Sequence, residues 1–278
     1  MSARALLVTG LNSQPGWFLN AALAEHPAAV TAIGRRRPAE LPANIAWRGV
    51  DLETPPRDLP AARVLLHMAP IWLLPPLLDA LADAPPAALI AVSSSSARTK
   101  ARTADSHERR LAERLAHGEQ AAQGRAEHHG ITCRILRPTL IYGHPSRGII
   151  PRVRGIGRRL RVFPVPMAAT GLRQPLHAAD LAAALWQLVS APEDTGASLQ
   201  EIGGGERLTF GAMIRRILAG AVPPIRPLPV PAPLLRGVLR VAPGDVGPGM
   251  LDRLAQDQVA DDRVLWQRLG LTPRPFQP

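Results

Sequence analysis

The stretch LLVTGLNSQPGWFLNAAL, residues 6–23, decides the fold of this chain. An apolar run of the kind that forms a buried strand ends at Thr9, and a stretch that favours a helix begins near residue 15. Gly10, Ser13 and Gly16 follow one another at intervals of three residues between them. Small residues at such a junction allow a tight turn and a close approach of the backbone to a phosphate, which then faces the helix N-terminus. The stretch therefore predicts the phosphate-binding turn of a dinucleotide site. A plain glycine turn is the alternative, because a serine takes the middle position.

Short apolar runs alternate with longer amphipathic or alanine-rich stretches along the first half of the chain. This alternation predicts parallel strands joined by crossover helices, which is a doubly wound α/β sheet, the Rossmann fold. The clearest helix spans 105–129, where Asp105 and Glu108 form a capping box and Gly130 is a stop signal. The strand-like runs are ALLV (5–8), AVTAI (29–33), IAWRGV (45–50), RVLLHM (63–68), ALIAVS (88–93) and ITCRIL (131–136), and the other helical stretches are 15–26 and 74–84.

The composition changes after residue 145, where the chain becomes rich in proline, glycine and arginine up to residue 166. Helical patterns return at HAADLAAALWQLV (177–189) and at MLDRLAQDQVADDRVLWQRLG (250–270), and prolines punctuate 223–248. We therefore expect a smaller C-terminal substrate-binding cap on the dinucleotide-binding domain. The expected boundaries are 1–144 and 172–203 for the dinucleotide-binding domain, and 145–171 and 204–278 for the cap.

The chain has 33 basic and 22 acidic residues, a formal charge of +11, and every basic residue except Lys100 is arginine. The arginines are scattered among acids and only 4% of residues are aromatic, so the pattern argues against nucleic acid and favours a small anionic substrate. One cysteine excludes an internal disulfide and indicates a cytoplasmic protein. The longest apolar region, 63–82, is broken by polar residues and prolines, so no membrane span is expected, and no metal site, because the histidines lack ligand spacing. A homodimer is compatible with the sequence.

The second strand-like run ends in AIGRRRP, residues 32–38. A site for NAD usually offers an acidic residue near this position to the ribose hydroxyls, whereas arginine suits a 2′-phosphate. Arg35 and Arg36 therefore favour NADP over NAD, with a solvated turn as the alternative. Asp51, after the third run, is either an adenine contact or a helix-opening cap.

Several motifs fall in the order seen in one family. They are Thr9-Gly10 with Ser13 and Gly16, Asp51-Leu52, His67-Met68-Ala69, Ser93-Ser94-Ser95, Arg137-Pro138 with Tyr142-Gly143, and RQPLHAADLA (173–182). Together they resemble the extended short-chain dehydrogenases/reductases, and most closely the NAD(P)-dependent epimerase/dehydratase family. The resemblance covers nearly the whole chain and implies a Rossmann fold and an NAD(P) cofactor. The implied cofactor contacts are Gly10, Asn12, Ser13, Gly16, Trp17, Arg35, Arg36, Asp51, Leu52, Met68, Ala69, Pro70 and Ser93.

The resemblance also assigns a reaction centre, but this chain departs from it. By resemblance, Ser95 is the serine whose hydroxyl orients the substrate carbonyl or alcohol. The family's acid/base is a tyrosine with a lysine four residues later on one helix face, where the ammonium lowers the phenol pKa. Aligning Glu119 with the acid that follows this pair leaves Leu111 and Leu115 at those positions. Lys100 is the candidate replacement, with a solvated loop lysine as the alternative, and Tyr142 is expected to be a packing residue.

Arg173 lies where the family's sugar-nucleotide enzymes hold the substrate diphosphate, and a surface ion pair is its alternative reading. Two functions follow. The first is an atypical NADP-dependent oxidoreductase or epimerase acting on a nucleotide sugar or a related anionic metabolite. The second is a non-catalytic NADP(H)-binding sensor or structural protein of the same fold, which Leu111 and Leu115 favour.

Overall fold

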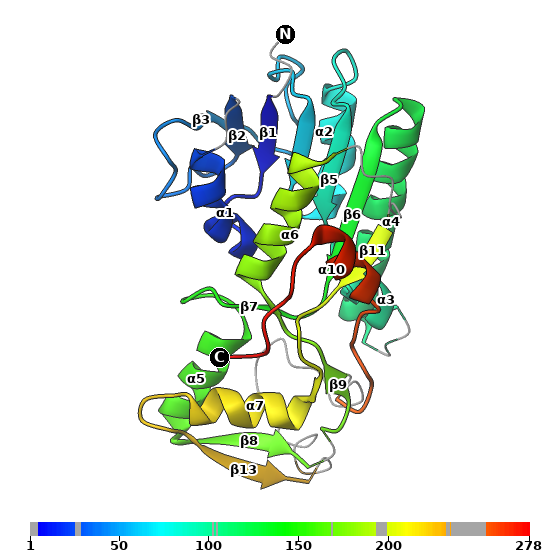
Figure 1. Ribbon diagram of the computed structural model, residues 1–278. Helices are drawn as coiled ribbons and strands as arrows, with labels where there is room; N and C mark the ends of the chain where they lie inside the picture. Colours follow the sequence, from blue (N-terminus) through cyan, green and yellow to red (C-terminus); the bar gives the residue numbers. More distant parts are fainter. Residues whose placement is uncertain are drawn as a thin grey trace.

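A computed structural model gives the fold and describes residues 5–25, 29–101, 103, 105–167, 169–192, 199–231, 234 and 254–278 (Figure 1). Its centre is a seven-stranded sheet in the order β11-β6-β5-β4-β1-β2-β3, with every neighbouring pair parallel. The strands are β1 (Leu6–Thr9), β2 (Val30–Gly34), β3 (Ala46–Gly49), β4 (Val64–His67), β5 (Ala88–Val92), β6 (Thr132–Pro138) and β11 (Leu199–Ile202).

Helices cover both faces of this sheet (Figure 1). On one face α1 (Gln14–Ala24) packs against α6 (Ala178–Ser190), and α10 (Arg263–Leu269) adds Leu265 and Trp266 to the same core. On the other face lie η1 (Ile71–Leu73), α2 (Leu74–Ala80) and α4 (Ser106–His128). The doubly wound parallel sheet expected from the alternation is confirmed, and each of the first six strands overlaps its predicted run.

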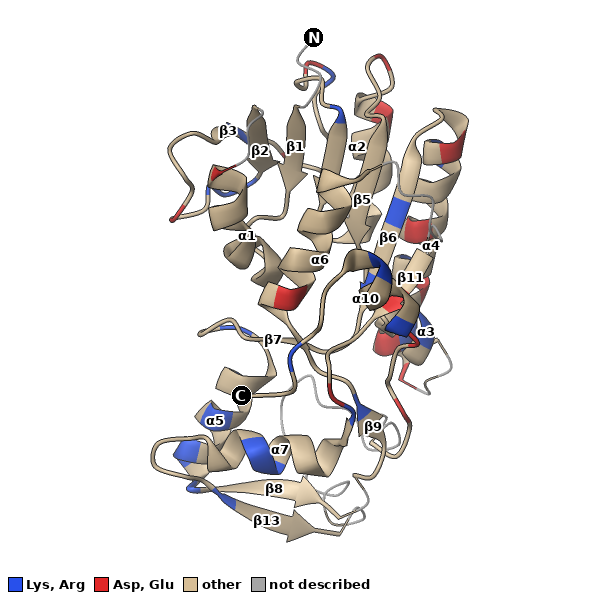
Figure 2. Ribbon diagram, viewed as in Figure 1, with Lys and Arg blue, Asp and Glu red and all other residues tan. Residues whose placement is uncertain are grey.

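A smaller cap lies beyond the carboxyl ends of the strands (Figure 2). It holds the parallel pair β8 and β13, on which α5 and α7 pack, together with short two-residue strands. Arginines mark α5 and α7, and the chain between Glu127 and Asp180 contains no acidic residue. The cap elements that lie within the expected cap boundaries are α5 (Ile149–Leu160), β8 (Val162–Pro166), β12 (Leu208–Thr209), α7 (Phe210–Ala219) and β13 (Arg226–Val230). The short strands β7 (Ile141–Tyr142), β9 (Leu172–Arg173) and β10 (Leu176–His177) lie outside those boundaries, and β9 pairs with β12.

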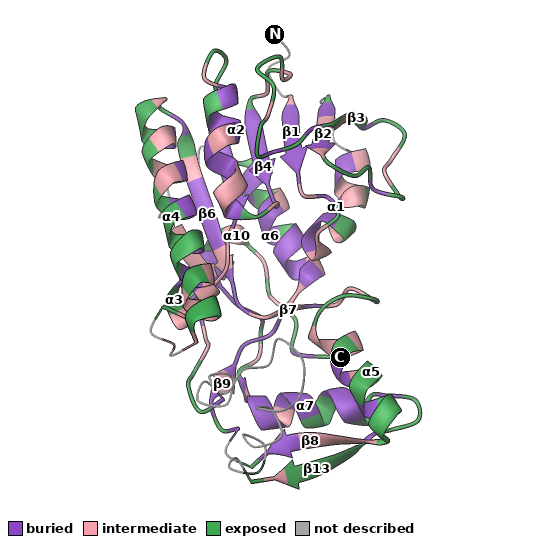
Figure 3. Cartoon of the chain, turned by 180° about the vertical axis from the view of Figure 1, so that it is seen from behind, coloured by how far each residue is buried: buried purple, intermediate pink, exposed green. Residues whose placement is uncertain are grey.

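Burial follows the layers (Figure 3). The strands β1, β4 and β5 are buried throughout, as expected for a parallel sheet that is covered on both faces. The cap has a separate core that includes Tyr142, Met213 and Phe276. The Tyr142 hydroxyl donates to the Pro275 carbonyl at 3.3 Å, and burial raises the pKa of this phenol. The expectation that Tyr142 is a packing residue is confirmed.

Helix α4 begins as the capping residues predicted, because the Asp105 carboxylate accepts from the backbone N–H groups of His107 and Glu108 at 2.9 and 3.2 Å. It ends before Gly130, which has φ +65°. The Glu108 side chain differs from the predicted box, since it forms an ion pair with Lys100.

Two segments depart from the sequence expectation. The proline-, glycine- and arginine-rich stretch contains helix α5, because Ile149, Val153 and Gly157 recur at helical spacing and turn toward the cap core. The long C-terminal helix expected over 250–270 is wrong for the part that is described, where only Arg263–Leu269 is helical. Before it, Gln258 forms a bridge with Arg173, which requires extended backbone. No helix among the described residues is long and apolar enough to cross a membrane.

Candidate functional site

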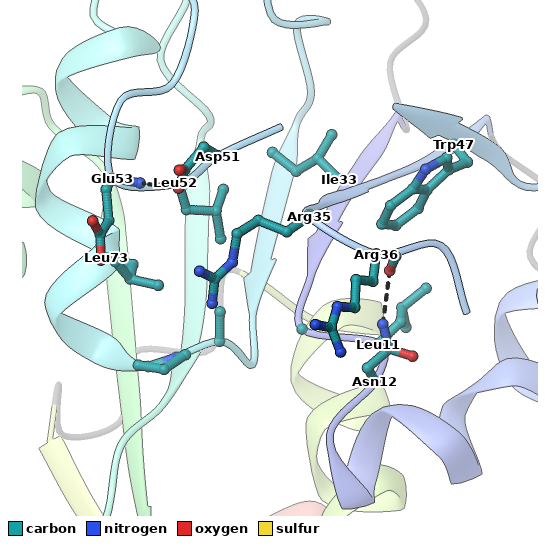
Figure 4. A pocket seen from close by; sticks show the side chains of 14 residues that line it. Leu11, Asn12, Ile33, Arg35, Arg36, Trp47, Asp51, Leu52, Glu53 and Leu73 are labelled. Carbon is teal, nitrogen blue, oxygen red and sulfur yellow. Dashed lines mark hydrogen bonds between the residues drawn. The ribbon is translucent and has the colours of Figure 1, made fainter. Parts of the chain in front are cut away.

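A cavity of about 500 Å³ opens where the glycine turn meets the carboxyl ends of β2 and β4 (Figure 4). In a doubly wound sheet ligands bind at this edge, outside the carboxyl ends of the strands. The lining combines apolar side chains with charged and polar ones. The lining residues are Gly10, Leu11, Asn12, Ile33, Gly34, Arg35, Arg36, Trp47, Asp51, Leu52, Glu53, Ala69, Pro70 and Leu73.

The two glycines of the turn are required by contacts within the protein. Gly10 has φ +75°, and a Cβ on it would lie 2.3 Å from the carbonyl carbon of Met68. A Cβ on Gly16 would lie 2.5 Å from the carbonyl oxygen of Leu11. Ser13 occupies the N-cap of α1, where its hydroxyl accepts from the Gly16 N–H at 3.2 Å. Contacts within the protein therefore require small residues in this turn, whether or not a phosphate binds there.

Arg35 and Arg36 are both exposed and both line the cavity. In Figure 4 the Arg35 guanidinium lies toward Asp51 and Leu52, whereas that of Arg36 lies beside Asn12. The Asp51 carboxylate accepts from the Glu53 N–H at 3.1 Å, and no helix follows in this loop, so it caps a turn rather than opening a helix. Both arginines therefore line the cavity at the end of β2, and their contact with a 2′-phosphate stays a prediction.

Trp47 is a lining residue that the sequence reasoning did not find. It comes from β3, and its ring approaches Gly34 closely enough that a Cβ there would lie 3.4 Å from it. The sequence did contain a signal for Trp47, an aromatic residue in a strand next to β2. The strand β3 pairs with β2 and ends beside the loop that carries Arg35 and Arg36. The indole forms one wall next to Arg36 (Figure 4).

Asn12 joins three segments. Its side-chain N–H donates to the Arg36 carbonyl at 2.7 Å, the contact drawn as a dashed line in Figure 4. Its own carbonyl accepts from the guanidinium of Arg147, which lies in the loop before α5. Trp17 meets the ring of His144 from the same loop at 5.4 Å between centroids. The glycine turn, the arginine loop and the cap are thus held together at one place.

His67 fixes the end of β4. Its ring is fully buried, and burial lowers its pKa to about 4. Nδ1 lies 2.9 Å from the Thr9 hydroxyl and Nε2 lies 3.2 Å from the Pro70 carbonyl. Because a carbonyl only accepts, Nε2 carries the proton and Nδ1 accepts from Thr9. This neutral ring positions Met68, whose backbone faces Gly10, and Ala69 and Pro70, which line the cavity.

Ser93 and Ser95, in the serine run after β5, have different contacts. The Ser93 hydroxyl donates to the buried carboxylate of Glu119, and Arg137 donates to the same carboxylate through two nitrogens, one of them at 2.9 Å. The hydrogen bond to Glu119 raises the pKa of Arg137. The Ser95 N–H donates to the Pro138 carbonyl at 3.0 Å, and Ser95 is half-buried at the N-cap of α3 (Ser96–Thr99). Ser93 therefore ties β5 to α4, while Ser95 stands at the strand edge.

The proposed replacement for the missing acid/base pair has a partner. The Lys100 ammonium lies 3.3 Å from a carboxylate oxygen of Glu108, and most of both side chains is buried. Leu111 and Leu115 pack in the core between α4 and the sheet, so the face that would carry the tyrosine and lysine is apolar. The structure thus ties Lys100 to Glu108 in the first turn of α4, which lies before Leu111 on the same helix.

Arg173 is buried, and burial lowers its pKa to about 10. Its guanidinium donates to the carbonyls of Leu172 and Gln256 at 2.8 and 2.7 Å and lies 5.4 Å from the ring centre of Phe210. These contacts join β9 to the segment before α10. Part of its donor capacity is therefore committed within the cap.

The chain has the fold of several solved structures. A complex of MoeE5 with UDP-glucuronic acid and NAD matches with a TM-score of 0.73 and 20% identity over 98% of this chain and 94% of that chain. The UDP-glucose 4-epimerase of Thermotoga maritima matches at 0.69 and 16% over 98% and 94%, and an NADPH-dependent quinone oxidoreductase of Escherichia coli at 0.65 and 17% over 97% and 96%. Neither a protein-family model nor a curated protein sequence matches. Epimerases and dehydratases recur among the structural neighbours, so the resemblance read from the motifs is confirmed for the fold.

Proposed function

We propose that this protein binds NADP(H) in the cavity at the glycine turn. The carrying observation is that Arg35 and Arg36 both line that cavity, at the end of β2 where a dinucleotide site meets the ribose. The residue set fits the group: Leu52 and Ala69 offer apolar contact to an adenine, Arg36 and Asn12 lie beside the turn, and α1 begins directly after it.

The experiment compares two cofactors and three proteins. Titration calorimetry should give a tighter Kd for NADPH than for NADH. Arg35→Ala with Arg36→Ala should weaken NADPH binding by about 10²-fold, since each charge-assisted hydrogen bond contributes about 1.5 kcal/mol or more. The matched control is Arg37→Ala, an exposed neighbour outside the cavity lining. Equal affinities for the two cofactors in the wild type would refute the NADP assignment.

The proposed activity is that of an oxidoreductase or epimerase/dehydratase-like enzyme acting on a nucleotide sugar or a similar anionic metabolite. The fold neighbours and the arginine-rich cap support an anionic substrate. Bound NADP(H) supplies hydride transfer. Ser95 would orient the reacting carbonyl or alcohol, and Lys100 or a water held by Ser95 would move the proton that the family's tyrosine otherwise moves.

A second candidate is a non-catalytic NADP(H)-binding protein of the same fold. The apolar packing of Leu111 and Leu115 favours it, because neither side chain can move a proton. A substrate screen that follows NADPH absorbance separates the two functions. Turnover of any nucleotide sugar that Lys100→Met slows supports the enzyme, and silence across the screen with intact NADPH binding supports the sensor.

A further inference from the structure

Two long stretches of the cap carry charge of one sign. No Asp or Glu occurs between Glu127 and Asp180, and none between Glu206 and Asp245. The helices α5 and α7 and the strands β8 and β13 all come from these two stretches. Figure 2 shows arginines without acidic residues where α5 meets the start of β13. The exposed arginines of α5, β8 and β13 are Arg152, Arg158, Arg159, Arg161 and Arg226.

Two segments that are distant in sequence form one corner of the cap. Strand β8 follows α5 directly, and β13 pairs with it so that Arg226 stands opposite Val162. A Cβ on Gly157 would meet the Ile225 side chain at 2.8 Å, and the Arg154 guanidinium donates to the Gly220 carbonyl at 2.8 Å. We call residues 156–162 and 220–226 the α5–β13 corner.

This corner also exposes large apolar side chains. Leu160 is 55% exposed and Val222 is 83% exposed, and Ile156 beside them is 41% exposed. Single exposed apolar residues need no explanation, but a group of them among charges of one sign marks a contact surface. Six of the eight large hydrophobic side chains that are exposed among the described residues lie in the cap. They are Ile156, Leu160, Met167, Val222, Leu228 and Leu234.

We propose that the α5–β13 corner binds the surface of a bilayer with anionic headgroups. Guanidiniums donate forked hydrogen bonds to lipid phosphates, and the negative potential of such a surface attracts them. Leu160 and Val222 are branched aliphatic side chains that gain free energy at the boundary between headgroups and acyl chains. A nucleic acid would interact only with the arginines, because the corner contains no aromatic residue on which a base could stack. The pairing of exposed aliphatic and cationic side chains is what selects the lipid surface.

The test is co-sedimentation of the full chain with vesicles. Vesicles of phosphatidylcholine with phosphatidylglycerol should retain the protein at low salt, and vesicles of phosphatidylcholine alone should not. Raising the salt concentration should release the protein, because exposed charges are screened. Each arginine at such a surface contributes about fivefold to the partition coefficient.

Two variants and two matched controls separate the contributions. Replacement of Arg158, Arg159, Arg161 and Arg226 by Gln should lower the partition coefficient by about 10²-fold or more. The charge-matched control replaces Arg57, Arg110, Arg263 and Arg268, which are exposed on other elements, and should retain binding. Leu160→Ser with Val222→Ser should weaken vesicle binding several-fold, whereas Val264→Ser, at a position 66% exposed on α10, should not.

The outcomes decide the proposal without reference to the cofactor. Urea unfolding of each variant reports whether the protein is folded. Equal sedimentation of the corner variant and the charge-matched control would show that binding depends only on net charge, and it would overturn the proposal. So would vesicle binding that is insensitive to Leu160→Ser with Val222→Ser, or binding to heparin and DNA but not to anionic vesicles.

Discussion

The two halves of the carboxyl edge of the sheet differ in how many of the residues implied by the family resemblance they contain. Around β1, β2 and β4, eight of the thirteen residues that the family resemblance implies for a cofactor line one cavity, and a buried histidine holds that edge in place. Ser13, Gly16, Trp17, Met68 and Ser93 are not among the lining residues. Around β5 and α4, Leu111 and Leu115 pack against the core at the positions that the resemblance assigns to the proton-transfer pair. The proposed cofactor site and these two positions come from different elements, so substitutions can test them separately.

The largest expected effect tests the binding half. Gly10→Val should abolish NADPH binding and destabilise the fold by about 3 kcal/mol or more, because a branched side chain at positive φ would meet the backbone of Met68. Urea unfolding and NADPH titration measure the two effects. Gly49→Val is the control, because nothing lies within 4 Å of its Cβ position. A normally stable Gly10→Val protein would contradict the geometry of the turn.

The next effect tests the chemical half. A positioned general acid contributes about 10² to 10⁴ in rate, so we expect turnover of nucleotide sugars that is slower by about this factor than with a tyrosine in place. If Lys100 moves the proton, Lys100→Met should lower kcat. Glu108→Gln removes the carboxylate that pairs with Lys100 but keeps the ammonium. This variant should keep activity, with a pH-rate profile that is shifted along the pH axis. Fast wild-type turnover that neither Lys100→Met nor Ser95→Ala alters would refute this site.

A smaller effect concerns the histidine that supports the binding half. Burial lowers the pKa of His67 to about 4, so the folded state excludes a proton that the unfolded chain binds below pH ~6.5. Stability should therefore fall by about 3 kcal/mol as the pH drops from about 6.5 to about 4, with no further loss from this group below that range. Urea titrations across the range measure it. The pH-dependent part should shrink in His67→Gln, and an unchanged slope in that variant would remove His67 as its cause.

The smallest effect concerns the contact between the glycine turn and the loop that carries Arg36. Asn12→Ala removes the hydrogen bond to the Arg36 carbonyl, which contributes about 1 kcal/mol, so NADPH binding should weaken by about fivefold. NADH binding should change less, because the contact positions Arg36, which we propose binds the 2′-phosphate. Calorimetry with both cofactors gives the ratio of the two Kd values. Equal losses for NADPH and NADH would indicate a general role in holding the turn.

The sequence by itself determined the layers of this protein. Apolar periodicity located six strands, and capping residues located the start of α4, because strand and helix patterns are set by neighbours a few residues apart. It also brought Arg35, Asp51 and Ala69 to one site, since parallel strands end at the same edge.

Only the tertiary structure decided which side chains meet across that edge. The ion pair of Lys100 with Glu108, the burial of Arg173 under Gln256 and the wall formed by Trp47 depend on how distant segments lie side by side. The same holds for Gly10, whose need for glycine comes from Met68, the residue after β4. Such contacts depend on strand register and on the approach of loops, and neither is written in a local pattern of residues.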